Sequence, residues 1–302
     1  METKFLLRFG KLGKKAYYFC EILKYIRSVI IKRYRKLFGI NEISQKKIKK
    51  FVSKNSYKQK SLFLPSNQLI TIVVPCYNHS LYLDKMFESI INQTQYSDEV
   101  ILINDFSRDN TDERLEKFKS NYEKIFRISI YSNDKNLGQS KTLNYAISKA
   151  KTDLIMVLND DDYLFYDAIE IVKKIFKLYK NIFMLGSASI HFNNDSELEE
   201  YQKNFLKHDR VKDLKLTIHK TSDVEKYKNY NDLNMTHSGC TFYKYVWNFV
   251  GGYFSNKKAR IVPFSDRDFQ LRVNCFFNVG VLYETPLAFW RSSSSLDYGK
   301  NT

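Results

Sequence analysis

The chain has 302 residues, 43% of them hydrophobic and 27% charged, with only 10 glycines and 4 prolines. This composition excludes a collagen-like, low-complexity or wholly disordered protein. The net charge of +16 by itself suggests a nucleic-acid partner, but residues 1–60 carry 18 basic and 3 acidic residues, whereas the rest carry 31 and 30. Because the charge excess is confined to the N-terminal segment, we expect no nucleic-acid partner.

Residues 1–68 are predicted to form a basic extension and a connector to the globular part. Within them, residues 16–31 have the pattern of an amphipathic helix, with charged residues such as Arg27 on one side and Ile22 and Ile26 on the other. The charges exclude a helix that spans a bilayer. Two interpretations stay open: the helix binds the anionic inner face of the cell membrane, or its apolar side packs on protein. Four separated cysteines, expected to be reduced, indicate a cytoplasmic location.

Apolar runs typical of buried strands alternate with helical patterns from residue 69 onward. We expect strands at residues 70–74, 100–103, 128–131, 154–158 and 183–185. Helices are expected in the intervals, the first two beginning with Ser80 and Thr111 as N-caps. Alternation at this pitch predicts an α/β fold, in which helices cover both faces of a largely parallel sheet.

Polar residues follow three of the predicted strands, at 75–78, 104–109 and 159–162. Ligands of such sheets bind beyond the carboxyl ends of the strands, so we expect these segments to line one crevice. The successive aspartates at 160–162 repel each other, and a bound divalent cation relieves that repulsion. Oxygen ligands without His or Cys favour Mg²⁺ or Mn²⁺. The alternative is a turn that only caps the helix beginning near Asp167.

Glycine-rich phosphate-binding motifs are missing from the sequence, both GxGxxG after the first strand and GxxxxGK[ST] anywhere. Dinucleotide-dependent dehydrogenases, P-loop ATPases and nucleotidyltransferases are therefore disfavoured, since each binds phosphate through such a loop. A cation on the aspartates is then the available group for neutralising a diphosphate.

Five segments of the sequence resemble the family 2 glycosyltransferases, which have the GT-A fold. In chain order they are ITIVVPCYN (70–78), EVILINDFSRDNT (99–111), NLGQSKTLNYAI (136–147), LIMVLNDDD (154–162) and SDRDFQLRV (265–273). The resemblance covers residues 69–290 and implies a Rossmann-like, mostly parallel central sheet. It also implies that residues 69–190 bind the nucleotide sugar, and that residues 191–302 carry the acceptor site and the catalytic base.

This resemblance implies a role for each matching residue. Tyr77 stacks on the nucleotide base, Asp105 accepts a hydrogen bond from it, and Asp160 faces the ribose and the metal. Asp161 coordinates the metal directly, and Asp266 is the general base. The donor-binding residues that it implies are Pro75, Tyr77, Asn78, Asp105, Lys141 and Asp160.

The residues themselves leave structural alternatives open. These are a strand-end contact for Tyr77, an Asx turn for Asp105 and a helix cap for Asp266. His237 and Ser238 are expected at the acceptor site, and for His237 the alternative is a purely structural role.

The resemblance implies an inverting, metal-dependent glycosyltransferase of the hexosyl- or N-acetylhexosaminyltransferase class. Its donor would be a nucleotide sugar, expected to be a UDP-sugar, and its acceptor a hydroxyl of a polysaccharide or glycolipid. Mg²⁺ or Mn²⁺ would offset the charge on the departing nucleoside diphosphate while Asp266 takes the proton of the acceptor hydroxyl. The alternative is a non-catalytic scaffold with the GT-A fold at the membrane surface. Asn159 and Leu143 favour it, because the family usually has Asp and Arg at these positions.

Overall fold

The computed structural model describes residues 43–56, 68–205, 209–221 and 233–292. The amphipathic helix expected at 16–31 lies outside these residues. Contacts divide the chain into one unit of residues 1–43 and 228–230 and a second of residues 44–227 and 231–302. All the elements described below belong to the second unit.

The first half of this unit alternates strands and helices. Its four neighbouring strands are β1 (Ile70–Cys76), β2 (Glu99–Asn104), β3 (Arg127–Ser132) and β4 (Leu154–Val157). The helices that follow them are α4 (Ser80–Ile91), α5 (Thr111–Tyr122), α6 (Gln139–Lys149) and α7 (Ala168–Leu178). Every residue of β1, β2 and β4 is buried, as is typical of strands covered by helices on both faces.

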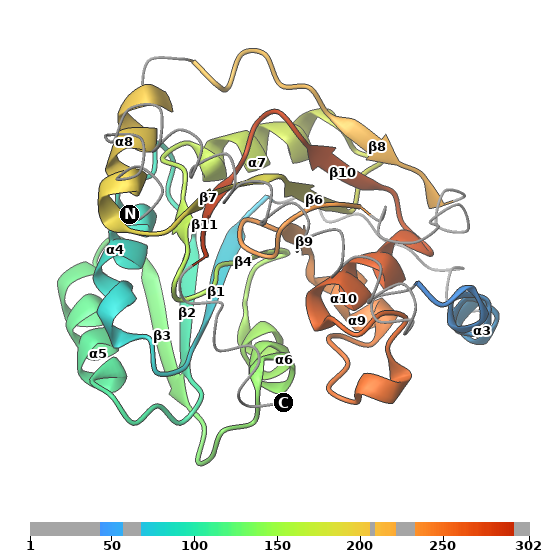
Figure 1. Cartoon of the computed structure of the whole chain (residues 1–302), viewed down its shortest axis with the longest axis horizontal. Coiled ribbons are helices and arrows are strands. Elements are labelled where there is room, and N and C mark those ends of the chain that lie inside the picture. The colour runs from blue at the N-terminus through green and yellow to red at the C-terminus, as the bar shows by residue number, and fades with distance from the viewer. Residues whose placement is uncertain (1–42, 57–67, 206–208, 222–232, 293–302) are drawn as a thin grey trace, which may run out of the picture. The chain divides into compact units, whose positions relative to one another are not determined.

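The chain reverses its direction across the sheet between β3 and β4. The strand order is β3-β2-β1-β4, with parallel pairing throughout. Because crossovers between parallel strands are right-handed, α4 and α5 cover one face of the sheet and α6 the other, as Figure 1 shows. The point between β1 and β4, where the order reverses, is the place at which α/β sheets bind ligands.

The second half of the unit extends the same sheet and adds a smaller one. The extending strands are β6 (Met184–Ser187), β8 (Thr217–His219), β9 (Thr241–Tyr243) and β10 (Val279–Leu282). β9 runs antiparallel to both β4 and β6, so the eight-stranded sheet is mixed. The smaller sheet consists of β5 (Tyr163–Leu164), β11 (Ala288–Arg291) and β7 (Ser189–Phe192). Further helices are α8 (Asp195–Phe205), α9 (Lys244–Val250) and α10 (Ser265–Asn274).

The predicted α/β fold with a mostly parallel sheet is confirmed. Each of the five strands expected from apolar runs is present, with boundaries that differ by at most two residues. The N-cap predictions were wrong by one position, because Ser80 and Thr111 are the first helical residues and the caps are His79 and Asn110. The cysteines at 76, 240 and 275 are buried, and none of them forms a disulfide in the part of the chain that the structure describes.

A helix also forms inside the segment that we expected to be a connector. α3 (Gln45–Asn55) begins after Ser44, whose hydroxyl oxygen accepts a hydrogen bond from the Lys47 N–H. Its Ile48 is fully buried, and the ring of Phe51 contacts the ring of Phe276 edge-on. Part of the predicted connector therefore packs on the globular domain.

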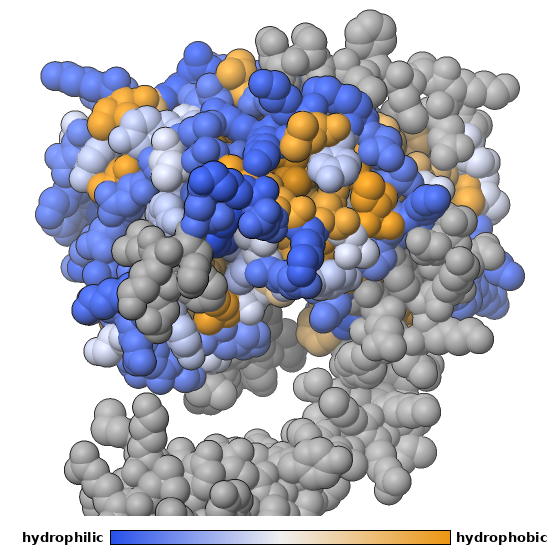
Figure 2. Space-filling model, turned by 90° about the horizontal axis from the view of Figure 1, so that it is seen from above, coloured by the Kyte–Doolittle hydropathy of each residue, from blue (hydrophilic) through white to orange (hydrophobic). Residues whose placement is uncertain are grey.

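In the part of the chain that the structure describes, none of the helices is long and apolar enough to span a bilayer. Figure 2 shows one face of the molecule, largely hydrophilic, with a patch of hydrophobic residues near its middle. Apolar atoms contribute much of the surface of any folded protein, so the patch by itself does not indicate a binding site.

Candidate functional site

The sheet opens at its carboxyl edge between β1 and β4. Their last paired residues are Val73 and Val157, after which the Leu158 N–H donates to the Val73 carbonyl (3.1 Å). Pro75 lies two residues further along β1, so its backbone nitrogen faces the same side. That nitrogen carries no hydrogen and cannot continue the ladder to β4. The buried Pro75 thus stands where the two strands part.

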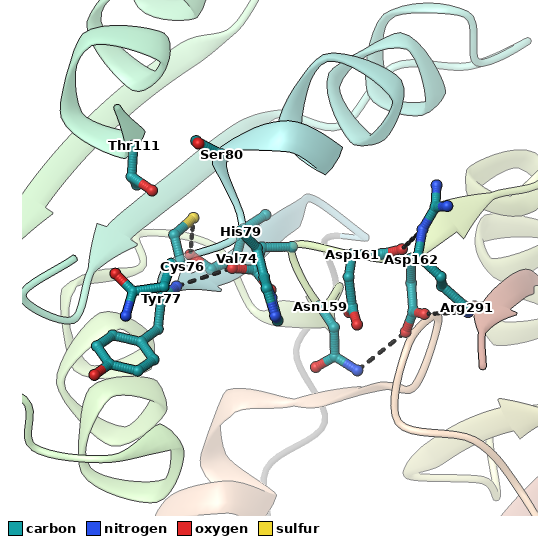
Figure 3. Close-up of polar contacts among 12 residues, drawn as sticks. Val74, Cys76, Tyr77, His79, Ser80, Thr111, Asn159, Asp161, Asp162 and Arg291 are labelled. Atoms are coloured by element: carbon teal, nitrogen blue, oxygen red, sulfur yellow. Dashed lines mark hydrogen bonds and ion pairs between the residues drawn. The ribbon is translucent and has the colours of Figure 1, made fainter. Parts of the chain in front are cut away.

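The acidic turn at residues 159–162 follows β4 and lies against the end of β1. Asp160 is 6% exposed. Its Oδ2 accepts a hydrogen bond from the Tyr77 N–H (2.9 Å), and its Oδ1 lies 2.9 Å from Nδ1 of His79. Figure 3 shows Tyr77 and His79 beside the turn that carries Asp161. The expected meeting of the β1 and β4 ends is therefore present.

His79 supplies a nitrogen to a set of possible metal ligands that the sequence suggested would contain only oxygen. One ligand atom from each of His79, Asp160 and Asp161 can be chosen so that all three lie within 4.8 Å of one another. Burial by itself disfavours the imidazolium, but the hydrogen bond and the charge of Asp160 outweigh this effect and raise the pKa of His79 to about 9. The all-oxygen ligand set stays a prediction, to which the structure adds His79 as a candidate nitrogen ligand.

Asp162, the last carboxylate of the turn, points away from this set and is held by three donors. It accepts hydrogen bonds from the Ser238 hydroxyl (2.5 Å), the Asn159 side-chain amide (3.0 Å) and the Arg291 backbone N–H (3.0 Å), two of which appear in Figure 3. Burial, with the charge of Asp161 adding to it, raises the pKa of Asp162 to about 8. Asp162 therefore anchors the turn.

Asp105, at the end of β2, organises the loop that leads into α6. Its carboxylate accepts hydrogen bonds from the Asn133 side chain (2.7 Å) and from the N–H groups of Leu137 (2.8 Å) and Gly138 (2.9 Å). Gly138 has φ +79°, a conformation that glycine adopts without strain. The carboxylate thus shapes this loop, and its hydrogen bond to a nucleotide base stays a prediction.

Asn78 joins the β1 end to the loop after β2. It has a left-handed backbone conformation (φ 54°), which Asn tolerates better than most residues. Its side-chain oxygen accepts a hydrogen bond from the Arg108 N–H (2.8 Å), and its own N–H donates to the Ser107 hydroxyl (3.0 Å). Asn78 therefore couples two of the three polar segments of the crevice.

Asp109 accepts hydrogen bonds from the first helical residues of both α4 and α5. Its Oδ2 accepts from the Ser80 N–H (2.8 Å), and its Oδ1 accepts from the N–H (3.2 Å) and the hydroxyl (2.6 Å) of Thr111. These N–H groups have no partner inside their own helices. One exposed carboxylate thereby fixes the starts of two helices that flank the crevice.

Replacing Asp109 by Ala is expected to lower the free energy of unfolding by about 1–2 kcal/mol, because each helix loses an N-terminal acceptor. Burial alone raises the pKa of Asp109, but the hydrogen bonds from Thr111 and Ser80 outweigh it and lower the pKa. The stabilisation is therefore present at neutral pH and is lost as the pH falls through the lowered pKa. Urea unfolding near neutral pH and in acid measures both effects.

Asp109→Asn is the matched control for this prediction. It keeps one acceptor oxygen but has no charge, so its stability should lie between those of the Ala variant and the unchanged protein. Equal stability of all three proteins near neutral pH would contradict the capping role.

The remaining donor-site predictions differ in exposure. Tyr77 is 39% exposed at the end of β1, as a ring that stacks on a base requires. Lys141 is exposed in the first turn of α6, whereas Leu143, two residues further on and on another face of the helix, is buried. Stacking on a base by Tyr77 and a diphosphate contact by Lys141 stay predictions.

The predicted acceptor residues adjoin the acidic turn. The Asn159 N–H donates to the Ser238 hydroxyl (3.0 Å), and Nδ1 of His237 lies 3.3 Å from the Asn159 side-chain oxygen. Nε2 of His237 lies 3.1 Å from the Tyr253 hydroxyl. Burial lowers the pKa of His237, so its imidazole is neutral at pH 7 and its Nδ1–H donates to Asn159. Both side chains form hydrogen bonds within the protein. A role of either residue in binding an acceptor stays a prediction.

Asp266 lies half-buried in the first turn of α10, and that helix is held by a buried ion pair. Nε of Arg272 lies 2.9 Å from Oδ2 of Asp268, with both side chains fully buried. The other guanidinium nitrogens donate to the carbonyls of Val250 (2.7 Å) and Gly252 (2.7 Å). A buried ion pair of this kind tolerates little movement, because each partner must stay hydrogen-bonded. The ion pair and the two carbonyls thus anchor α10, the helix that carries Asp266.

Residues 71–248, more than half of the chain, match the family described as glycosyl transferase family 2. The chain belongs to this family. It is 35% identical over 130 residues to the chondroitin synthase of Pasteurella multocida, covering 43% of this chain and 13% of that protein. It is 33% identical over 102 residues to an uncharacterized glycosyltransferase of Haemophilus influenzae, covering 34% and 40% of the two chains.

Among solved structures, this family 2 chain resembles S. aureus TarS 1–349 in complex with UDP-GlcNAc. The TM-score is 0.55 at 15% identity, over 74% of this chain and 59% of that one. A likeness at this identity shows the fold alone. The chain spans less than half the length of the curated relatives described above.

Two departures from the usual family 2 pattern have physical explanations here. Asn159 stands where Asp is usual, and its amide donates to Asp162 at 3.0 Å. An ionised Asp at 159 could not donate this hydrogen bond. Leu143 stands where Arg is usual, and its side chain is buried against the sheet rather than turned to the crevice.

Sequence reasoning missed two residues that contact the acidic turn of this family 2 site. His79 directly follows the polar segment 75–78, and that position was the available signal. The side chain of Arg291 reaches the Asp161 carbonyl (3.2 Å) from the C-terminal strand β11. Nothing in the sequence spacing relates residue 291 to residue 161.

Proposed function

We propose that the chain is an inverting glycosyltransferase that moves a sugar from a nucleotide-sugar donor to a hydroxyl of a saccharide or glycolipid acceptor. The observation that carries the proposal is the contact of Asp160 with the Tyr77 N–H across the gap between β4 and β1. It brings an exposed aromatic ring and two carboxylates to one point of the sheet edge, as a base and a cation-bound diphosphate require.

The donor set fits a divalent cation. Asp160 and Asp161 offer carboxylate oxygens and His79 an imidazole nitrogen, with the three ligand atoms within 4.8 Å of one another. His79 offers this nitrogen once the cation displaces the proton that the raised pKa keeps on it at neutral pH. Carboxylates suit both Mg²⁺ and Mn²⁺, whereas imidazole suits transition metals better than Mg²⁺. We therefore favour Mn²⁺. Bound there, the cation would offset negative charge on the leaving nucleoside diphosphate.

Asp266 is proposed as the general base that takes the proton of the attacking acceptor hydroxyl. Its charge acts on His237 and Tyr253, and His237 in turn contacts Asn159 of the acidic turn. This electrostatic influence on His237 supports a role for Asp266 beside the expected acceptor residues. A single carboxylate suffices, because a diphosphate leaves without protonation by an acid.

The relatives support a UDP-sugar donor and a polysaccharide acceptor. They include proteins named chondroitin synthase, hyaluronan synthase and minor teichoic acid biosynthesis protein GgaB, and TarS has been solved with UDP-GlcNAc. We propose a UDP-hexose or UDP-N-acetylhexosamine as donor for this chain.

Thermal unfolding of the full chain with Mn²⁺ and UDP, singly and together, tests the proposal. Binding raises the melting temperature, so the pair should raise it more than the sum of the two single additions. A panel of UDP- and GDP-sugars with Mn²⁺ then identifies the donor, with EDTA as the control. If Mn²⁺ and UDP together leave the melting temperature unchanged, the non-catalytic scaffold becomes the better account.

A further inference from the structure

Arg291, the last residue of β11, touches the acidic turn through both its backbone and its side chain. Its backbone N–H donates to Oδ1 of Asp162 (3.0 Å), and its Nε–H donates to the backbone carbonyl of Asp161 (3.2 Å). Figure 3 shows the side chain beside this turn. A residue 129 positions from Asp162 in the chain is therefore part of its immediate support.

The guanidinium of Arg291 is fixed on its faces and on its edges. The guanidinium carbon lies 4.4 Å from the ring centre of Tyr82 and 4.5 Å from that of Phe192. Nη2 donates to the Asp195 carboxylate at 2.7 Å, and the Arg291 side chain is only 6% exposed. Contacts with two rings and a carboxylate leave a planar group little freedom. Arg291 thus offers the Asp161 carbonyl a donor in a fixed place.

The contact with Arg291 acts on Asp161 directly, whereas the other bonds of the acidic turn described above hold Asn159, Asp160 and Asp162. The turn lies between β4 and the two-residue strand β5 (Tyr163–Leu164), and its neighbouring carboxylates repel one another. A turn free to adjust would relax by separating Asp160 from Asp161, and the two would no longer face one cation. The positive guanidinium beside the turn also offsets part of the negative charge.

We propose that Arg291 is a positioning residue of the transferase site, which holds the Asp161 backbone so that the carboxylates of Asp160 and Asp161 face one cation. Residues that orient metal ligands without touching the metal set its affinity by about 10- to 100-fold. The effect of Arg291 is therefore on the affinity for the cation and the nucleotide together. This inference rests on the proposed function.

Arg291→Lys tests the role of the side chain while keeping the backbone bond to Asp162. Lys retains the charge but lacks the planar fork that reaches Asp161 and Asp195 at once. With UDP present, binding of Mn²⁺ by the full chain is followed through the electron paramagnetic resonance signal of the free ion. We expect about tenfold weaker Mn²⁺ binding in Arg291→Lys, and a larger loss in Arg291→Gln.

Arg114→Lys is the matched control, since Arg114 also joins two elements through an ion pair, with Asp84 of α4, but not at the acidic turn. It should bind Mn²⁺ as the unchanged chain does. Wild-type affinity in a folded Arg291→Lys or Arg291→Gln variant would overturn the positioning role.

Should both Arg291 variants fail to fold, Asp195→Asn decides the question. It removes the outer ion pair of Arg291 at a half-exposed position and should weaken Mn²⁺ binding about threefold, which is below the loss expected for Arg291 itself. Unchanged binding there would refute the proposal. If the unchanged chain shows no Mn²⁺ binding with UDP, the proposed function fails instead, so the two failures are distinguishable.

Discussion

Asp266→Asn is expected to reduce the rate of sugar transfer by about 10²- to 10⁴-fold, the usual contribution of a general base. Asn has nearly the same shape as Asp but cannot accept the proton of the acceptor hydroxyl. Asp266 lies on α10, whereas the donor-site predictions lie at the ends of β1, β2 and β4 and on α6. Donor affinity should therefore be unchanged, and the loss should appear in kcat.

The measurement pairs transfer kinetics with binding of UDP and Mn²⁺ by the same preparation. Asp153→Asn is the matched control, since Asp153 is also half-exposed but comes just before β4, at the end of the strand opposite the acidic turn. It should leave both quantities unchanged. A loss of donor affinity in Asp266→Asn, with transfer reduced only in proportion, would favour the alternative of a helix cap.

We expect Asp266→Asn to lower the transfer rate without disturbing the structure, and this depends on which contacts anchor α10. The ion pair of Asp268 with Arg272 and the two carbonyls that Arg272 contacts hold the helix without using Asp266. The Asp268 Oδ1 also accepts from the Ile261 N–H (2.5 Å). Because these contacts anchor α10, we expect the helix to stay in place when residue 266 is changed. The sequence pattern of Asp266 and Arg272 therefore combines a proposed chemical role with a structural one.

The parallel half of the sheet could be predicted from the sequence because its strands are continuous apolar runs. β1, for example, has Ile70, Ile72, Val73 and Val74 all fully buried, and such runs are typical of strands covered on both faces. The meeting of the β1 and β4 ends followed from the same pattern, since polar residues mark where each run ends. The hydrogen bond from the Tyr77 N–H to Asp160 is the contact that joins these two strand ends.

The second half could not be predicted in the same way. β8 and β9 have three residues each, too few to show a period, and the antiparallel insertion of β9 depends on long-range pairing. Arg291 gives no local signal either, because its partners Tyr82, Phe192 and Asp195 come from three separate elements. His79 was missed because its role depends on Asp160, 81 positions away.

Asp161→Asn is expected to reduce metal-dependent transfer by about 10²- to 10³-fold, because the leaving diphosphate loses a charge-stabilising group. Asp161 is the only half-exposed carboxylate of the acidic turn, and Asp160 and Asp162 are both buried and hydrogen-bonded. Its removal should thus weaken Mn²⁺ binding while sparing the fold. Raising the Mn²⁺ concentration should restore part of the activity, which loss of a general base would not allow.

Transfer rates measured across a Mn²⁺ titration, with the melting temperature as a check on folding, decide the matter. Asp213→Asn serves for comparison, as it removes one carboxylate from an exposed position outside the turn and should not alter the Mn²⁺ dependence. Normal activity of Asp161→Asn at low Mn²⁺ would remove Asp161 from the metal site and leave His79 and Asp160 as the ligands to examine. An activity loss that no Mn²⁺ concentration relieves would instead place Asp161 in direct contact with the sugar or the nucleotide.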